Sequence, residues 1–331
     1  MLEKLFGSKV GVKILSEMGK NPYKEFYLNE LSKNLKIGLG RTKTILDNLV
    51  DLNILKKRKS GNRFFLKLNE NNPLSFEIIK FANLDALTKL DDDFRYAITN
   101  FSNAYENILG DNLLSIIVFG SIAKEEATRC SDIDILVIVK EQPKKGIKEE
   151  LRRYFSSILD IFSKITEEKI FTEKEFEEKY ENGDDFLINI MKDGIIVFDR
   201  NFFYSKILLR GLPVITKKTI KIKLDAVKET LDYSLEVYKK HPELIAPGLG
   251  IISNHLSRSV LLLNGILPES KHEICDQLKN IKENRLARTY KKTRIWFDNP
   301  PLEVNKDDVW NMLNFLKEKY NECYRMLERW M

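Results

Sequence analysis

The most constraining feature of the chain is the stretch VFGSIAKEEATRCSDIDILVIV, residues 118–139. The apolar runs that frame it predict two β-strands, over residues 112–121 and 131–140. The second strand carries two carboxylates, Asp132 and Asp134, where a core strand would be expected to be apolar. Their presence therefore needs a physical reason.

The two aspartates belong to one face of the predicted strand, because side chains alternate along a strand, and Ile133 lies between them on the other face. Two like charges so close raise each other's pKa and destabilise the folded state. A divalent cation removes that penalty, and carboxylate oxygens suit Mg²⁺. The pattern therefore predicts a site for Mg²⁺, or Mn²⁺, at Asp132 and Asp134.

The turn after the first strand has features of a phosphate-binding site, which would lie beside the metal. Glycine at position 120 allows backbone N–H groups to approach a polyphosphate closely, and the Ser121 hydroxyl adds a donor. The following residues, IAKEEA (122–127), are expected to open a helix whose N-terminus attracts anions. Phosphates on the turn and metal on the strand together indicate phosphoryl or nucleotidyl transfer.

Gly-Ser followed ten residues later by Asp-x-Asp resembles the nucleotidyltransferase superfamily of DNA polymerase beta. It is most similar to the minimal branch, which includes antitoxin adenylyltransferases and relatives of the aminoglycoside-modifying enzymes. The resemblance implies attack on the α-phosphate of an NTP, most commonly ATP, by a hydroxyl of a protein, an RNA or a small molecule, with loss of pyrophosphate. It also implies that Asp132 and Asp134 hold metal and that Gly120, Ser121 and Lys124 bind the nucleotide.

The family uses a third carboxylate from a neighbouring strand, which holds metal and deprotonates the attacking hydroxyl. The expected strand is residues 163–176, and the family spacing assigns Glu167 to this role, with Glu168 on the other face. Two positions depart from the family pattern: Glu replaces the usual Asp, and Lys124-Glu125 stands where active members often have Arg-Gly. The alternative is a DNA-binding regulator whose nucleotidyltransferase domain binds NTP without turnover.

The first 72 residues carry a strong positive charge, with fifteen Lys and Arg against seven Asp and Glu, a net +8 in a chain of net +6. This asymmetry predicts docking of an anionic polymer. Expected helices up to Gly19 and over 27–35 and 38–53, then a basic hairpin around residues 60–62, resemble a winged helix-turn-helix domain. The resemblance implies DNA contact by Arg41, Thr42, Lys43, Lys57, Arg58, Lys59 and Arg63. A protein-protein or dimerisation module is the alternative.

From residue 213 onward, apolar residues recur at helical spacing, which predicts a small helical bundle. The architecture resembles HEPN-type helical domains, but Arg258 lies fourteen residues before His272, so the ribonuclease spacing is absent. The basic segment 285–297 is open to two interpretations, a phosphate-binding cleft or a solvated loop. A bundle that drives homodimer formation is a further possibility for the tail.

The sequence thus predicts an α+β multidomain protein: a winged helix over 1–72, a nucleotidyltransferase domain with a mixed sheet over 73–212, and a HEPN-like bundle over 213–331. No apolar run approaches the roughly 18 residues of a membrane span, so we expect a cytoplasmic protein without a membrane partner. The scattered cysteines and histidines give no zinc-ligand spacing.

Overall fold

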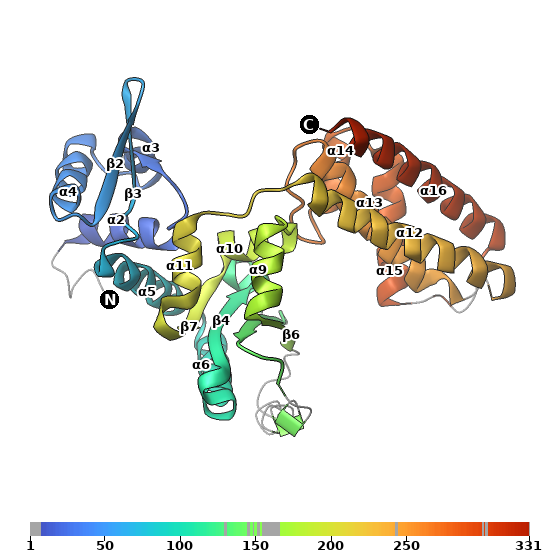
Figure 1. The fold of residues 1–331 in the computed structure, drawn as a ribbon, viewed down its shortest axis with the longest axis horizontal. Helices are drawn as coiled ribbons and strands as arrows, with labels where there is room; N and C mark the ends of the chain where they lie inside the picture. The colour runs from blue at the N-terminus through green and yellow to red at the C-terminus, as the bar shows by residue number, and fades with distance from the viewer. Residues whose placement is uncertain are drawn as a thin grey trace. The chain divides into compact units, whose positions relative to one another are not determined.

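The computed structural model describes residues 8–128, 131–143, 146–147, 149–150, 153, 166–241, 244–299, 301 and 304–330 (Figure 1). The chain divides into two compact units. One comprises residues 1–179 and 188–212, and the other, the helical unit, comprises residues 180–187 and 213–331. The division into three domains that the sequence predicts stays a prediction. Within the described residues, no helix combines the length and the apolar character that crossing a membrane requires.

The N-terminal region combines helices with a small antiparallel sheet of order β1-β3-β2. The Ser8 side chain caps the first helix, and Gly61, with a φ of +57°, forms the tight turn of the hairpin. The elements are α2 (Lys9–Lys20), β1 (Phe26–Tyr27), α3 (Leu28–Asn34), α4 (Leu39–Asp51), β2 (Leu55–Ser60) and β3 (Arg63–Leu68). Three helices followed by a hairpin are the order that the sequence predicts.

Two helices connect this region to the larger sheet, α5 (Pro73–Leu87) and α6 (Asp92–Leu109). The Asn72 side chain caps α5, and Pro73 occupies its first position, where a missing N–H costs nothing. The buried Asn83 side chain of α5 accepts a hydrogen bond from the backbone N–H of Ile196, at 2.7 Å. The helix is thereby fixed to the sheet through a buried polar contact.

The larger sheet has four strands in the order β6-β5-β4-β7 (Figure 1). Strand β5 is parallel to β6 and antiparallel to β4, and β4 is antiparallel to β7. The strands are β4 (Leu113–Phe119), β5 (Ile133–Val139), β6 (Thr166–Thr172) and β7 (Ile195–Asp199). Helices α9 (Glu173–Glu181) and α10 (Asp185–Asp193) lie between β6 and β7 in the chain, and α11 (Phe203–Arg210) follows β7. Residues 180–187, at the end of α9 and the start of α10, belong to the helical unit.

One face of this sheet packs on α6 through a buried apolar cluster. Ile133, Ile135, Val137 and Val139 of β5 join a buried cluster with α6 residues such as Phe101. Because side chains alternate, Asp134 belongs to the opposite face. The packing of the apolar face fixes the register of β5, and this register in turn fixes the position of Asp134 at the strand's start.

The helical unit contains α12 (Lys217–Lys240), α13 (Ala246–Leu263), α14 (Ile274–Asn280), α15 (Asn284–Asp298) and α16 (Lys306–Arg329). A capping box between Thr216 and Thr219 starts α12. Buried apolar residues from all five helices form one core. The segment 285–297 lies within α15, so its interpretation as a loop is wrong.

A buried charge cluster lies inside the helical unit. Asp185 is fully buried, forms an ion pair with Lys223, and accepts a hydrogen bond from Nε of Arg258 at 2.7 Å. Burial alone would raise the pKa of Asp185, but the two cations outweigh it, and its pKa is below the usual range. Burial, with the nearby charges of Lys223 and Arg258, lowers the pKa of His255. These side chains connect α10, α12 and α13, which is a structural role.

Candidate active site

The two aspartates of the sequence motif lie at the start of β5. Asp132 directly precedes the strand and is exposed, whereas Asp134 lies within the strand and is half-buried. In the sheet, Asp134 pairs with Phe119, the last residue of β4, and with Glu167 of β6. The structure therefore places Asp134 beside the end of the strand that leads into the Gly-Ser turn.

Gly120 and Asp134 are in close contact, and this contact explains the glycine. Gly120 has a φ of +73°, a conformation that side chains disfavour. A Cβ added at this position would lie 2.0 Å from Oδ2 of Asp134, far inside any real contact. Glycine at position 120 is thus required both by the backbone of the turn and by the carboxylate that lies against it.

The third carboxylate can be placed only by its backbone. Parallel pairing of β5 and β6 puts Asp134 opposite Glu167, and Ile135 opposite Glu168. The Glu167 side chain lies outside the described residues. Glu168 accepts a hydrogen bond from the Tyr105 hydroxyl of α6, on the side of the sheet that α6 covers. Burial and the Glu168 charge raise the pKa of Tyr105, so its hydroxyl is a donor. The placement of Glu168 agrees with the face that the sequence predicts for it, and the sequence gives no signal for Tyr105.

The residues after the turn differ in part from expectation. Helix α7 (Gly120–Ala123) begins at Gly120, two residues earlier than the sequence predicts, and has only one turn. Lys124 is half-buried at its C-terminal cap, and Glu125 follows with a φ of +61°. The Glu125 carboxylate lies 3.9 Å from Nζ of Lys20 at the end of α2. This second departure from the family pattern thus has a local cationic partner.

The donor set at this site consists of carboxylate oxygens. Within the part of the chain that the structure describes, no cluster of three or more His, Cys, Asp or Glu side chains forms a metal site. Asp132 and Asp134 supply two carboxylates from one strand, and a third ligand at position 167 would have to come from outside the described side chains. Hard oxygen donors without nitrogen or sulfur suit Mg²⁺ or Mn²⁺ and not zinc.

The predicted nucleic-acid residues of α4 differ in accessibility. Arg41 and Lys43 are exposed near the start of the helix, and neither has an ion-pair partner among the described residues. Thr42 is fully buried, and its hydroxyl donates to the Gly38 carbonyl at 3.1 Å. The expectation that Thr42 contacts a ligand is therefore wrong, because helical periodicity turns its side chain into the core.

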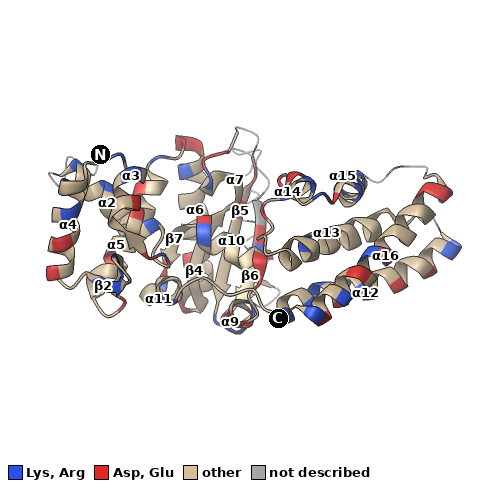
Figure 2. Ribbon diagram, turned by 90° about the horizontal axis from the view of Figure 1, so that it is seen from above, with Lys and Arg blue, Asp and Glu red and all other residues tan. Residues whose placement is uncertain are grey.

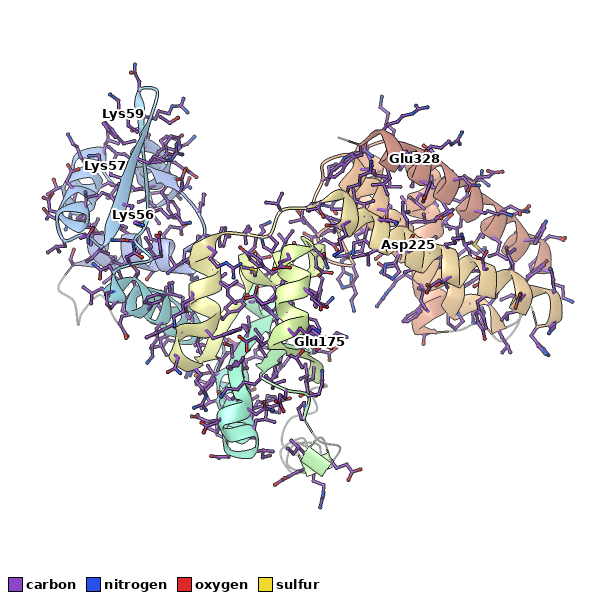
Figure 3. The ribbon with its side chains drawn as sticks, viewed as in Figure 1. Lys56, Lys57, Lys59, Glu175, Asp225 and Glu328 are labelled. Carbon is purple, nitrogen blue, oxygen red and sulfur yellow. The ribbon has the colours of Figure 1, made fainter. Side chains whose placement is uncertain are left out.

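The hairpin of β2 and β3 presents an exposed row of cations (Figure 3). Several of them are already paired: Lys56 with Glu70 at 2.6 Å, Lys57 with Asp47 at 3.6 Å, and Arg58 with Glu25 at 2.6 Å. Lys59 and Arg63 flank the turn, and within the described ranges they have no carboxylate partner. Of the predicted phosphate contacts, these two are the most available.

Aromatic rings support the hairpin cations. The Nζ atoms of Lys57 and Lys59 lie 4.7 and 5.9 Å from the centre of the exposed Phe64 ring. The guanidinium of Arg63 lies 5.7 Å from the centre of the Tyr27 ring. Such contacts hold a cation in place without neutralising it. Figure 2 marks the positions of Lys and Arg and of Asp and Glu along the ribbon.

Comparison with known proteins identifies the family. The family model described as polymerase beta, nucleotidyltransferase, matches residues 98–203, which contain the turn, β5 and β6. A Methanocaldococcus jannaschii protein, provisionally named a protein adenylyltransferase, is 32% identical over 130 residues. That alignment covers 36% of this chain and 81% of the relative. The chain belongs to the polymerase beta nucleotidyltransferase family, and it is a nucleotidyltransferase.

Two solved structures show weaker likenesses. Spectinomycin adenyltransferase AAD(9) from Enterococcus faecialis, solved with ATP and spectinomycin, is 17% identical with a TM-score of 0.42, covering 68% of this chain and 99% of that chain. A toxin-antitoxin complex with AMP-PNP is 20% identical with a TM-score of 0.23, covering 41% and 96%. Both TM-scores are low, so neither likeness carries an argument about this chain.

Proposed function

We propose that the protein transfers AMP from ATP to a hydroxyl group of a protein, an RNA or a small molecule. The observation that carries this proposal is the contact between the Asp134 carboxylate and the glycine turn at Gly120. A carboxylate held against a phosphate-binding turn brings a metal ligand and a triphosphate together. The name of the Methanocaldococcus jannaschii relative, a protein adenylyltransferase, supports adenylyl as the transferred group.

The residues present fit a divalent cation. Asp132 and Asp134 would hold Mg²⁺ or Mn²⁺ together with Glu167, whose backbone is the register neighbour of Asp134. When bound, such an ion neutralises charge on the phosphates and stabilises the transition state of transfer. Without it, the negative charges of the aspartates would oppose the approach of a triphosphate.

The chain's own residues account for the remaining steps. Backbone N–H groups at Gly120 and the Ser121 hydroxyl donate to phosphate oxygens, and Lys124 adds a positive charge. The acceptor oxygen forms a bond to the α-phosphorus, the bond from that phosphorus to the β-phosphate oxygen breaks, and pyrophosphate leaves. The acceptor's proton passes to the carboxylate of Glu167, which acts as general base. The turn thus positions the nucleotide, and β6 positions the general base.

We also propose that the N-terminal region is a winged helix that binds duplex DNA. The order of helices and hairpin supports this, as do the exposed Arg41 and Lys43 on α4 and Lys59 and Arg63 on the hairpin. Arg58 is a weaker candidate because Glu25 holds its guanidinium through two hydrogen bonds, of 2.6 and 3.1 Å. The proposal of a HEPN-like, dimer-forming tail rests on its helical architecture.

The experiment incubates the protein with Mg²⁺ and α-labelled ATP in three arms: soluble cell proteins, total RNA, and a small-molecule extract. Label that appears in one arm identifies the class of acceptor and supports transfer. Magnesium-dependent ATP binding without label in any arm contradicts the transfer proposal and supports a nucleotide sensor instead. An Asp132→Asn/Asp134→Asn variant, which lacks the proposed metal ligands, is the control: label that it still transfers does not come from this site.

A further inference from the structure

The helical unit contains a second cationic region that the transfer reaction does not use. Arg285, Arg288 and Lys292 lie on α15 at helical spacing, and all three are exposed. They line a hollow together with Met312 and Phe315 of α16. We call this hollow the α15–α16 groove. Its cations and the intervening residues belong to the segment that sequence alone leaves open between a phosphate cleft and a loop.

The groove combines cations with aromatic rings. The Arg285 guanidinium lies 4.1 Å from the centre of the Phe315 ring. About two and three turns beyond Arg285 on α15, the same stripe continues through Lys292 to Trp296, and Nζ of Lys292 lies 5.0 Å from the centre of the Trp296 ring. A guanidinium stacked on a ring keeps its outer N–H groups available for an anion. Both rings are half-buried, so the stripe offers charge together with partly exposed flat surfaces.

The charge balance of the groove favours an anion. Among the residues that the structure describes, Asp308 is the one carboxylate that lines it, and its Oδ2 lies 3.2 Å from Nζ of Lys292. Both partners are largely exposed, so water screens this pair and it neutralises little. Within the described part of the chain, Arg285 and Arg288 have no carboxylate within ion-pair distance. The groove thus keeps a net positive charge.

The spacing of the stripe fits a nucleic-acid strand. From Arg285 to Trp296 is eleven residues, which corresponds to about 16 Å along a helix. A stripe of that length carries three cations, which can contact several successive phosphates of a single strand. Single-strand binding sites typically pair backbone cations with rings on which bases stack. An acidic peptide would use the cations but would have no comparable use for the rings.

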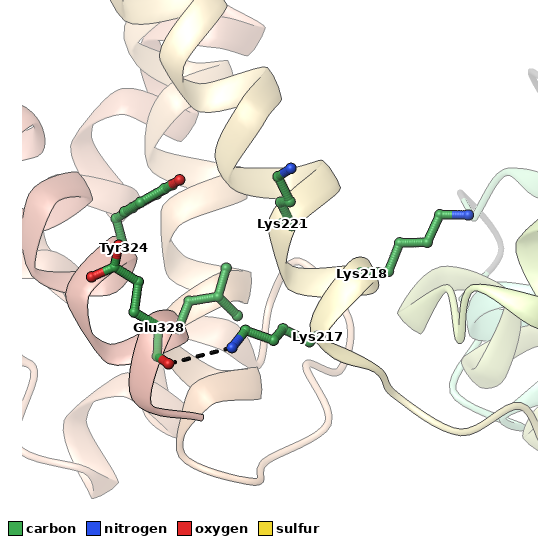
Figure 4. Close-up of a pocket in the computed structure, with 6 residues that line it drawn as sticks. Lys217, Lys218, Lys221, Tyr324 and Glu328 are labelled. Atoms are coloured by element: carbon green, nitrogen blue, oxygen red, sulfur yellow. Dashed lines mark hydrogen bonds between the residues drawn. The ribbon is translucent and has the colours of Figure 1, made fainter. Parts of the chain in front are cut away.

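The other notable hollow of the helical unit is less suited to this role (Figure 4). Lys217, Lys218 and Lys221 of α12 line it, but Nζ of Lys217 already donates to the Glu328 backbone carbonyl, at 3.3 Å. The Glu328 residue also lines this hollow with Tyr324. The cationic stripe of α15, which carries both free guanidinium groups and rings, is the better site.

We propose that the α15–α16 groove binds single-stranded nucleic acid through its phosphates and bases. The proposal does not depend on nucleotidyl transfer. It concerns a site in the helical unit, distinct from the duplex-binding surface proposed for the N-terminal region. RNA and DNA share the chemistry that the groove recognises, and parallel binding experiments with the two distinguish them.

The test measures fluorescence anisotropy of labelled 12-nucleotide RNA and DNA on the full chain. Every protein carries Lys59→Gln and Arg63→Gln, which removes the proposed hairpin contacts. The groove variant adds Arg288→Gln and Lys292→Gln. Its matched control adds Lys228→Gln and Lys317→Gln, two exposed lysines outside the groove. Thermal melting confirms that both variants are folded.

We expect the groove variant to bind at least about tenfold more weakly. The slope of log affinity against log salt concentration should become shallower by roughly 1.4, because two phosphate contacts are lost at about 0.7 each. The control should change affinity less than about twofold. Asp308→Asn should tighten binding, since it removes the groove's carboxylate. The proposal is overturned if the parent does not bind, if the groove variant binds like the parent, or if the control loses as much affinity.

Discussion

Replacing Gly120 by alanine tests whether the glycine turn and Asp134 act as one unit. The added Cβ would lie 2.0 Å from Oδ2 and 3.0 Å from Cγ of Asp134. Either the carboxylate or the turn must move by more than an ångström. Because Asp134 is the proposed metal ligand and the turn the proposed phosphate site, either movement separates the two parts of the site.

We expect Gly120→Ala to have a small effect on stability and a large effect on the reaction rate. At a φ of +73°, alanine is strained by about 1–2 kcal/mol. Part of this is offset because alanine restricts the unfolded chain, by about 0.4–1 kcal/mol. We therefore expect the melting temperature to fall only by about 2–4 °C. A displacement of about 1 Å in the reacting groups costs on the order of 100-fold in rate.

Gly265→Ala is the matched control. Gly265 has a φ of +72°, nearly the same as Gly120, but an added Cβ would meet nothing within 4 Å. Both variants are assayed by thermal melting and by the initial rate of Mg²⁺-dependent pyrophosphate release from ATP. We expect similar melting temperatures and a rate loss confined to Gly120→Ala. Equal rates for the two variants would refute the reasoning.

Three further predictions concern charge. Asp185→Asn should destabilise the helical unit by about 3–5 kcal/mol in urea unfolding at pH 7, since it leaves Lys223 and Arg258 buried without their carboxylate. The pKa of Asp185 is lowered on folding, so its stabilisation should disappear as pH falls below about 4, and this pH dependence should be absent in the variant. Folding also lowers the pKa of His255, so stability should decrease as pH falls below about 6.5, and His255→Leu should flatten that decrease in a pH series of melting curves. Glu25→Gln should release Arg58 and tighten duplex DNA binding by about two- to threefold in anisotropy titrations, whereas unchanged affinity would show that Arg58 faces no phosphate.

The sequence predicts most strands and helices of this protein because their apolar patterns are strong. The run at residues 131–140 becomes β5, and the periodic run from residue 220 becomes part of α12. Sequence reasoning does not find the helix at 285–297, where arginines, lysines and exposed aromatics obscure the buried stripe of Leu286, Ala287 and Tyr290. Intrinsic helix propensity, which favours Arg, Lys and Ala, was the available signal.

The candidate site is predicted less completely than the fold. The sequence predicts Asp132, Asp134 and the Gly-Ser turn as one group, and the structure shows one part of it, the contact of Asp134 with Gly120. This part is predictable because strand alternation and local turns are short-range features. The pairing of Glu168 with Tyr105, and of Glu125 with Lys20, joins residues far apart in the chain. No short-range pattern contains such contacts. The burial of Thr42 also depends on the rotation of α4 against its neighbours.

The most direct test of the central proposal measures the rate of label transfer from α-labelled ATP by an Asp132→Asn/Asp134→Asn variant, with Asp91→Asn/Asp93→Asn as a control of equal charge. The control positions are exposed and lie on or next to α6. We predict that the first variant loses Mg²⁺-dependent transfer of label from α-labelled ATP by at least about 1,000-fold, while the control retains it. Transfer at the parent rate by a folded Asp132→Asn/Asp134→Asn protein would contradict the proposal that these carboxylates hold the metal for the reaction.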